Sequence, residues 1–363
     1  MPIPEPCFDS CFRMPRSARE ILEDRSIEAS APCRIDSGGT WDIKSLALPF
    51  EHVKPVTLNI ALNLRTWITL SPHKKGRVKV VSQGFAASEE YPFQGLRLTS
   101  PFNIFFAAVV YFGYHGLEVH IKSDSPPKSG LGGSSTALVA LIKALCRLDY
   151  LANQKKRSSR EILHLAYHLE DAMGDGKCGM QDQGAALYGG VNLWTWSYGS
   201  TRVPFKRQAL LRGQGTKELA RHILVAYSGK SHVSRRTNRK WIKEFLDGRT
   251  RKGWIRVNHL CKEFADALEM MDWKAAGHIM RMEMAIRRQI TPDSLTPLTR
   301  RLISQAEKMG CGARFAGAGA GGAVWAIGEM ENIMDLRDTW DRTLATVRGG
   351  KVLDCSIDSR GAY

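Results

Sequence analysis

The hydrophobic residues of the chain recur in two patterns that predict different elements. Short runs of β-branched and aromatic residues, bounded by glycine, proline or polar residues, are typical of strands. Longer stretches that are apolar on one face or all round predict helices. We therefore predict strands at 56–70, 78–81, 117–121, 191–196, 222–227, 312–316, 323–327 and 351–357, and helices at 102–111, 137–148, 161–173, 234–246, 254–271, 273–289 and 295–309.

The polar segments between these elements indicate how the chain is divided. Three prolines precede residue 7, so we expect residues 1–30 to form an extension outside the core. Residues 202–216 are polar and contain glycine, which favours a link between two domains at 31–205 and 206–363. A chain of 363 residues is long enough for two domains.

The composition excludes several classes of protein. Hydrophobic residues make up 43% of the chain, which is too many for a disordered protein. The longest apolar run is far shorter than the roughly 20 residues that a membrane-spanning helix needs. Acidic residues interrupt the first 30 residues, so no secretory signal peptide is predicted and we expect a cytoplasmic protein. The cysteines form no CxxC pair, and the pairs Cys7–Cys11 and His164–His168 lack further metal ligands at a suitable spacing.

The positive charge is concentrated in one segment. Lys and Arg number 52 against 36 Asp and Glu, and residues 230–256 hold ten of the basic residues with only two acidic ones. Such a segment attracts phosphates, on small molecules or on nucleic acid, although a solvated helix face has the same composition. We expect Lys230, Arg235 and Arg236 to reach ligand phosphates. Trp241 and Trp254 lie among these charges, as in some nucleic-acid-binding segments, but we do not expect a nucleic-acid partner.

A glycine-rich stretch at 127–137 lies between a predicted strand and a buried helix. Glycines let the backbone approach an anion closely, and the helix that begins at Ser134 or Ser135 adds the positive end of its dipole. This context favours phosphate binding, whereas the alternative is a flexible turn with a serine cap. The stretch is not a Walker A motif because it lacks the Gly-Lys-Ser/Thr ending.

Two other glycine clusters have less specific patterns. The GxGxxG at 317–322 precedes a predicted strand rather than a helix, so it is not a dinucleotide-binding fingerprint. The cluster at 37–42 follows Arg34 and Asp36, and this combination suits the recognition of hydroxyl groups as well as it suits a surface turn.

Taken in order, the motifs at 31–42, 127–137, 179–190 and 312–322 make residues 31–345 resemble the GHMP kinase family, and within it the sugar kinases, D-glycero-D-manno-heptose 7-phosphate kinases above all. The resemblance implies an α+β fold of two domains, an N-terminal one like domain 2 of ribosomal protein S5 and a ferredoxin-like C-terminal one. It also implies ATP and Mg²⁺.

The resemblance implies a role for each matching residue. Asp182 would accept or orient the attacking hydroxyl, and Arg34 would lie near the transferred phosphoryl group. Ser134, with Ser135 as the alternative, and Glu170, with Asp171 as the alternative, would bind Mg²⁺. The nucleotide would contact Lys128, Gly130, Leu131, Gly132, Gly133, Ser134, Ser135, Gly317 and Gly319, and the sugar would contact Asp36, Gly39, Thr40, Asp42, Gln181 and Gly321.

The expected activity is transfer of the γ-phosphoryl group of ATP to a sugar or sugar-phosphate hydroxyl, with the anomeric hydroxyl of D-glycero-D-manno-heptose 7-phosphate as the first choice. Met180 and Trp41 depart from the family pattern and bear on the choice of sugar. The alternatives are a kinase for a free sugar such as fucose or galactose, a homoserine- or mevalonate-type kinase, and a catalytically silent binding protein of the same fold.

Overall fold

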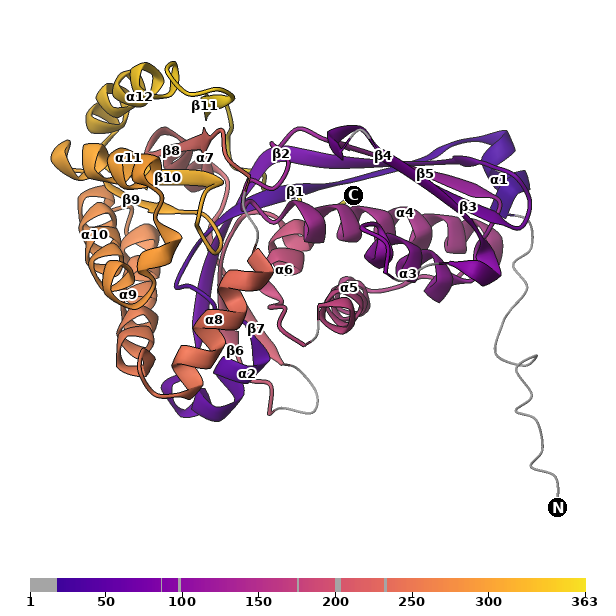
Figure 1. Ribbon diagram of the computed structural model, residues 1–363, viewed down its shortest axis with the longest axis horizontal. Coiled ribbons are helices and arrows are strands. Elements are labelled where there is room, and N and C mark those ends of the chain that lie inside the picture. The colour runs from indigo at the N-terminus through magenta and orange to yellow at the C-terminus, as the bar shows by residue number, and fades with distance from the viewer. Residues whose placement is uncertain (1–17, 86, 97–98, 175, 200–203, 232–233) are drawn as a thin grey trace.

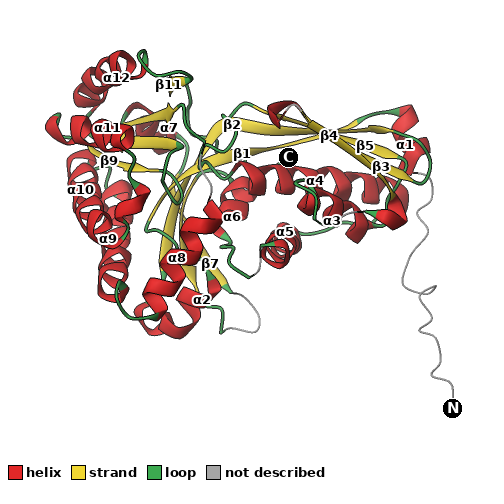
Figure 2. Ribbon diagram, viewed as in Figure 1, coloured by secondary structure: helices red, strands yellow, loops and turns green. Residues whose placement is uncertain are grey.

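The computed structural model describes residues 18–85, 87–96, 99–174, 176–199, 204–231 and 234–363, and it contains two sheets that are each covered by helices (Figures 1 and 2). The first sheet has the order β4-β3-β5-β2-β6-β7, with β1 paired to β2. Its strands are β1 (Ile27–Ser37), β2 (Val56–Pro72), β3 (Arg77–Ser82), β4 (Ala87–Pro92), β5 (Leu117–Ser123), β6 (Val191–Trp196) and β7 (Phe205–Leu211).

Strand β2 organises this sheet because it pairs along its length with β1, β5 and β6. Its first half lies beside β6, its second half lies beside β5, and β1 runs antiparallel to most of it. The register between β1 and β2 shifts between Pro32 and Cys33. Such a bulge re-aims the side chains next to it, and the residue that follows is Arg34.

Helix α4 (Gly133–Asn153) forms the centre of the helical layer against the first sheet (Figure 1). It is apolar nearly all round, as expected of a helix enclosed on all sides, and it packs on β1 and β2 while contacting α3, α5 and α6. The other helices of this half are α1 (Ala18–Asp24), α2 (Lys44–Ala47), α3 (Asn103–Phe112), α5 (Ser159–Met173) and α6 (Gln181–Tyr188), and short 3-10 turns lie at Leu48–Val53, Gln83–Phe85 and Phe93–Gly95.

The second sheet confirms the predicted ferredoxin-like domain. Its strands β8 (Ile223–Ser228), β9 (Gly312–Phe315), β10 (Ala323–Ile327) and β11 (Gly350–Leu353) lie in the order β11-β8-β10-β9, with helices connecting β8 to β9 and β10 to β11. Helices α9 and α10 pack on each other; α9 contacts β2 of the first sheet, and α10 contacts β9 of the second. Helices α11 and α12 pack together against the second sheet. The helices are α7 (Gln214–Arg221), α8 (Ser234–Leu246), α9 (Arg251–Glu269), α10 (Trp273–Ile290), α11 (Pro297–Lys308) and α12 (Met330–Leu344), with a 3-10 turn at Pro292–Ser294.

The structure differs from two of the expected boundaries. Residues 18–30 belong to the core, because α1 buries Ala18 and Leu22 and β1 begins at Ile27. Residues 1–17, which include the Cys7–Cys11 pair, lie outside the described residues. The expected link at 202–216 is wrong for 205–211, which form strand β7 paired with β6.

The end of the chain returns to the first sheet instead of staying with the second. Ile357 bridges to Leu62 in β2, and Tyr363 exchanges two backbone hydrogen bonds with Ser30 in β1, at 2.9 and 3.1 Å. Figure 1 accordingly shows the C terminus beside the first sheet. No described helix has the length and apolar character needed to cross a membrane.

Candidate active site

A cavity of about 740 Å³ brings together segments from both halves of the chain. Its walls come from β1 and the loop after it, the glycine-rich loop and the start of α4, the end of α5, the start of α6, α8, and the loop after β9. The predicted site residues that line it are Arg34, Asp36, Gly39, Thr40, Asp42, Lys128, Gly130, Gly132, Gly133, Ser134, Ser135, Glu170, Gln181, Asp182 and Gly317.

Three predicted contact residues lie elsewhere. The Leu131 side chain is buried in the core, and its carbonyl accepts a hydrogen bond from the backbone N–H of Arg34 at 3.0 Å. Gly319 packs against the backbone of Ser294, where a Cβ atom would approach the carbonyl oxygen to 2.5 Å. Gly321 lies against the backbone of residues 230–231. None of the three is among the residues that line the cavity.

The two glycine loops pack directly against each other. A Cβ atom on Gly130 would lie 2.9 Å from the carbonyl oxygen of Ala316, and one on Gly322 would lie 2.4 Å from that of Ser129. The N–H of Ala323 donates to the same Ser129 oxygen at 2.6 Å. Side chains at these glycines would force the loops apart, so the loop from the second half of the chain is positioned by the glycine-rich loop of the first.

The start of α4 is suited to binding an anion. Its N-cap residue is Gly132, which adopts the left-handed conformation at φ +79° and offers no side chain to cap the helix. The first N–H groups of a helix have no partner within the helix itself, and the helix dipole favours a negative charge beside them. Gly133, Ser134 and Ser135 in this first turn all line the cavity.

Arg34 and Asp182 form an ion pair beside this helix start. The Arg34 Nε donates to Asp182 Oδ1 at 2.7 Å, and its Nη1 donates to the carbonyl oxygen of Gly130 at 2.6 Å. Burial opposes the charge of Arg34, but Asp182 and Asp36 raise its pKa above the ordinary value. The Asp182 side chain stays 26% exposed, so a carboxylate held by a buried guanidinium faces the cavity.

Asp36 connects β1 to the second half of the chain. Its Oδ1 accepts from the N–H of Gly317 at 2.7 Å, and its Oδ2 lies 3.3 Å from Arg314 Nη2. Burial opposes ionisation, but Arg314 and Arg34 lower the pKa of Asp36 below its ordinary value. Although it lines the cavity, this carboxylate is engaged by protein groups on both oxygens, and it holds the loop after β9 in place.

Asp42 is held against the start of α6. Its Oδ2 accepts from the backbone N–H of Gln181 at 3.1 Å and its Oδ1 from the Gln181 side chain at 3.2 Å. A Cβ atom on Gly179 would lie only 1.7 Å from Asp42 Oδ2, which requires glycine at that position. The motif at 179–183 therefore positions the loop that follows β1 as well as Asp182.

Asp42 also gives the fold a pH dependence. Burial, together with the nearby Asp182 charge, raises the pKa of Asp42 from 3.8 to about 7. Between these two values the folded state holds a proton that the unfolded state has lost, so stability falls as the pH rises through this window. Replacing Asp42 by asparagine should remove that loss, and the variant should be more stable than the wild type at pH 8 by on the order of 2 kcal/mol.

Thermal unfolding of both proteins between about pH 5 and pH 8 checks this expectation. The unfolding midpoint of the wild type should decrease relative to that of Asp42→Asn as the pH rises. Parallel curves for the two proteins would show that Asp42 is ionised throughout this range and would contradict the prediction.

The residues proposed for the metal supply oxygen ligands of the kind that Mg²⁺ prefers. Ser134, Ser135 and Glu170 line the cavity, and Glu170 Oε2 accepts a hydrogen bond from Gln183 Nε2 at 2.7 Å. The alternative carboxylate, Asp171, accepts from the N–H of Cys178 at 3.1 Å and is not among the lining residues. Among the described residues, no group of three or more His, Cys, Asp or Glu side chains is arranged to hold a metal ion by itself.

Sequence reasoning missed several residues that line the cavity. Lys177 precedes the 179–183 motif and Gln183 ends it, and Asn238 and Arg239 belong to α8 in the basic segment. The concentration of positive charge at 230–256 did indicate a phosphate-binding segment. Of the residues expected to reach phosphates, Lys230 does not line the cavity, and the side chains of Arg235 and Arg236 lie outside the described part of the structure. Helical spacing alone could not indicate which basic residue of α8 faces the cavity.

The two tryptophans of the basic segment do not form a nucleic-acid surface. Trp241 and Trp254 are buried, and their rings enclose the guanidinium of Arg287 at 4.8 and 4.6 Å from its central carbon. Burial and the charge of Arg314 lower the pKa of Arg287 to about 9. Since neither ring is exposed, neither can stack on a nucleobase.

Comparisons with known proteins agree with this site. The model of the GHMP kinases N terminal domain matches residues 103–190, which contain the glycine-rich loop and Asp182. The chain is 27% identical over 318 residues to D-glycero-alpha-D-manno-heptose 7-phosphate kinase of Campylobacter jejuni, a match that covers 83% of this chain and 89% of that protein. It is 23% identical over 327 residues to the bifunctional fucokinase/GDP-fucose pyrophosphorylase of Arabidopsis thaliana, and the match spans 83% of this chain but only 30% of that longer protein.

The fold is shared with solved kinase structures. A D-glycero-D-manno-heptose 1-phosphate kinase from Bacteroides thetaiotaomicron superposes with a TM-score of 0.69 and 18% identity, over 93% of this chain and 98% of that one. The family model and the two curated relatives all match the part of the chain that holds the glycine-rich loop, and the solved structures share its fold. This chain belongs to the GHMP kinases, which are phosphotransferases that use ATP.

Proposed function

We propose that this kinase transfers the γ-phosphoryl group of ATP to a hydroxyl group of a phosphorylated sugar, and that the acceptor is the anomeric hydroxyl of D-glycero-D-manno-heptose 7-phosphate. The observation that carries the proposal is the composition of the cavity. The uncapped start of α4 and the Arg34–Asp182 pair lie in the same cavity as two further cations, Lys177 and Arg239. The similarity to the heptose 7-phosphate kinase of Campylobacter jejuni supports the choice of sugar.

In this proposal the nucleotide occupies the side of the cavity formed by α3, β5 and the glycine-rich loop. Phe102, Ile104, Phe105 and Ile121 give this side an apolar wall that suits a purine base. The phosphates would then lie along the loop, against the first turn of α4. Ser134 or Ser135 and Glu170 would hold Mg²⁺, which neutralises phosphate charge during the transfer.

The sugar would lie on the side formed by the loop after β1 and the start of α6. Thr40 Oγ1 and Gln181 Oε1 are buried there without a hydrogen-bond partner among the described residues. Buried polar atoms are costly unless they are paired, and small rearrangements on binding would let sugar hydroxyls pair with them. Lys177 and Arg239 would bind the phosphate that the sugar already carries.

The chemical step needs one proton acceptor and compensation of charge. The sugar hydroxyl oxygen forms a bond to the γ-phosphorus while the bond from that phosphorus to the bridging oxygen of ADP breaks. Asp182 takes the hydroxyl proton, and Arg34 holds the Asp182 carboxylate in place and adds positive charge beside the phosphoryl group.

Release of ADP from Mg-ATP, measured with free sugars and sugar phosphates, tests the proposal. We expect turnover with heptose 7-phosphate and little with fucose or galactose. In Arg239→Gln, KM for the sugar phosphate should rise about tenfold, the value of one charge-assisted contact, with KM for ATP unchanged. Lys240→Gln is the matched control because Lys240 is the next residue of α8 and pairs with Asp293.

Two results would overturn the substrate assignment. Turnover with free fucose or galactose alone would keep the kinase but exclude a phosphorylated acceptor. Absence of turnover with every sugar, while Mg-ATP still binds, would favour a different class of acceptor or a binding protein that lacks catalysis.

A further inference from the structure

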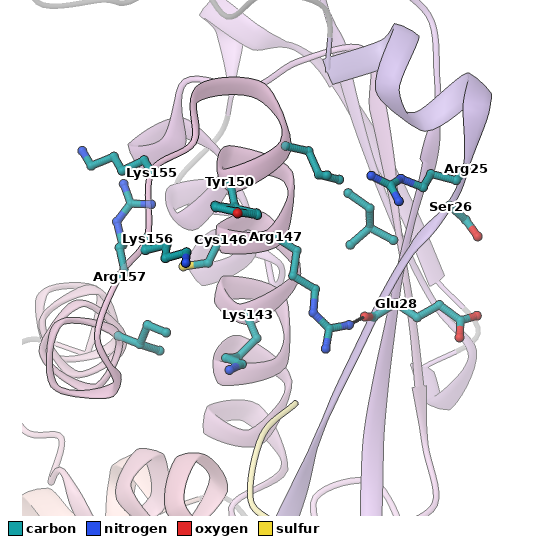
Figure 3. Close-up of a pocket in the computed structure, with 13 residues that line it drawn as sticks. Arg25, Ser26, Glu28, Lys143, Cys146, Arg147, Tyr150, Lys155, Lys156 and Arg157 are labelled. Carbon is teal, nitrogen blue, oxygen red and sulfur yellow. Dashed lines mark hydrogen bonds between the residues drawn. The ribbon is translucent and has the colours of Figure 1, made fainter.

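A second hollow of about 500 Å³ lies where the outer face of α4 meets the start of β1 and the loop between α4 and α5 (Figure 3). The described residues that line it are strongly biased in charge. The carboxylate among them is Glu28, and Figure 3 shows its side chain pointing away from α4. The basic residues are Arg25, Lys143, Arg147, Lys155, Lys156 and Arg157.

This hollow is separate from the catalytic cavity, with which it shares no lining residue. Both α4 and β1 contribute to the two sites, but with different segments: the start of α4 and the end of β1 line the cavity, whereas the second half of α4 and the start of β1 line the hollow. Ser135 and Arg147 are twelve residues apart on α4, which corresponds to about 18 Å along the helix axis. A ligand in the hollow would therefore not contact the glycine-rich loop.

Among the described residues, most of the basic side chains in the hollow have no carboxylate paired with them. Arg157 is the exception, because it pairs with Asp149 at 2.5 Å. Within the described part of the chain, Arg25, Lys143, Arg147, Lys155 and Lys156 form no ion pair with a carboxylate, and Arg147 donates instead to the backbone carbonyl of Glu28.

The environment of Lys143 disfavours its positive charge. It is half-buried, and burial together with the charge of Arg147 lowers its pKa below the ordinary value. Like charges that approach one another destabilise the folded state, and a bound anion would relieve the repulsion.

The shape of the hollow favours a small ligand. Its volume of about 500 Å³ falls in the range of sites for small molecules, about 300–1,000 Å³, and its six basic residues line this one hollow. Binding along a nucleic-acid backbone would instead favour a stripe of charge that follows the phosphates. We propose that the hollow binds a polyphosphate, a ligand with two or three linked phosphate groups, at a site distinct from the catalytic cavity.

Such a ligand could be an inorganic polyphosphate or a nucleotide, and Tyr150 distinguishes the two sources. Tyr150 is 39% exposed and lines the hollow, and Lys156 Nζ lies 5.2 Å from the centroid of its ring. A nucleobase can stack on this ring, whereas inorganic triphosphate cannot. Tyr150→Ala should therefore weaken ADP at this site and leave inorganic triphosphate unchanged.

The first experiment maps the site with inorganic triphosphate on the full chain. Lysines are acylated with and without the ligand, and the modification of each is measured by mass spectrometry. We expect protection of Lys143, Lys155 and Lys156, while Lys128 reports the catalytic cavity separately. This readout does not depend on kinase activity, so it can succeed or fail independently of the proposed function.

The second experiment measures the affinity by titration calorimetry. Lys143→Gln/Arg147→Gln should weaken triphosphate at least tenfold, and Lys155→Gln/Lys156→Gln, which alters only exposed side chains, should weaken it similarly. The matched control, Lys217→Gln/Lys274→Gln, removes two exposed cations elsewhere and should bind like the wild type. A melting temperature no lower than that of the wild type would show that each variant is folded.

Three outcomes would overturn the proposal. The first is equal acylation of Lys143, Lys155 and Lys156 with and without triphosphate. The second is an equal loss of affinity in the control variant, which would mean that binding follows overall charge. The third is tight binding of a 20-nucleotide RNA that needs Lys143 and Arg147 while triphosphate fails to compete, which would assign the surface to nucleic acid.

Discussion

Replacement of Asp182 by asparagine is expected to lower kcat by about 10²- to 10⁴-fold, the usual contribution of a general base. Asparagine has almost the same shape, and its Oδ1 can still accept the hydrogen bond that Arg34 Nε donates to Asp182 at 2.7 Å. The substitution therefore removes the negative charge and the proton acceptor but keeps the local geometry. Steady-state ADP release with the acceptor identified in the wild type measures the effect.

The accompanying binding measurements separate catalysis from folding. The affinity for Mg-ATP and KM for the acceptor should change little in Asp182→Asn, because Arg34 and the first turn of α4 remain in place. Asp266→Asn, an exposed change on α9, serves as the matched control and should retain full activity. A kcat within tenfold of the wild type would show that Asp182 does not accept the proton.

The parts of the site that the sequence predicts well are those encoded by neighbouring residues. The glycine-rich loop and the start of α4 lie within one short segment, and their residue types alone indicate phosphate binding. The pairing of Arg34 with Asp182 joins residues 148 positions apart. Only the resemblance to a family connected these two residues, because no local pattern encodes a contact of that sequence separation.

Some elements were missed although the sequence carries a signal for them. Helix α12 buries Ile333, Leu336, Trp340 and Leu344, whose spacing is helical, but its many charged residues resemble a loop when periodicity is ignored. Strand β1 was hidden for a different reason. It buries Ser30, Arg34 and Asp36 beside apolar neighbours, so the alternation expected of a half-buried strand is absent.

The buried charges between the two sheets were beyond the reach of sequence patterns. Arg314 in β9 is completely buried, and its Nη1 donates to Glu283 Oε1 in α10 at 2.7 Å, while Asp36 in β1 lies on its other side. Charged residues at these positions look like exposed ones when read from the sequence. Their pairing becomes visible only once three distant elements are placed together.

This network leads to the largest stability effect that we expect. Arg314→Met should destabilise the protein by about 3–5 kcal/mol, because it leaves the carboxylates of Asp36 and Glu283 buried with less compensating charge. Methionine keeps an unbranched apolar stem in the space, so the loss of charge dominates the loss of volume. Urea unfolding at pH 7 measures the effect, and Arg300→Met on the exposed face of α11 should lie within about 0.5 kcal/mol of the wild type.

The pH dependence identifies the cause of that loss. In the wild type, Arg314 and Arg34 lower the pKa of Asp36 against the opposing effect of burial, so this stabilisation is complete above the ordinary value of 3.8 and disappears as the pH falls through the lowered pKa. The difference between the wild type and Arg314→Met should therefore narrow below about pH 4. A difference that stays constant with pH would mean that altered packing, and not the unpaired carboxylate, destabilises the variant.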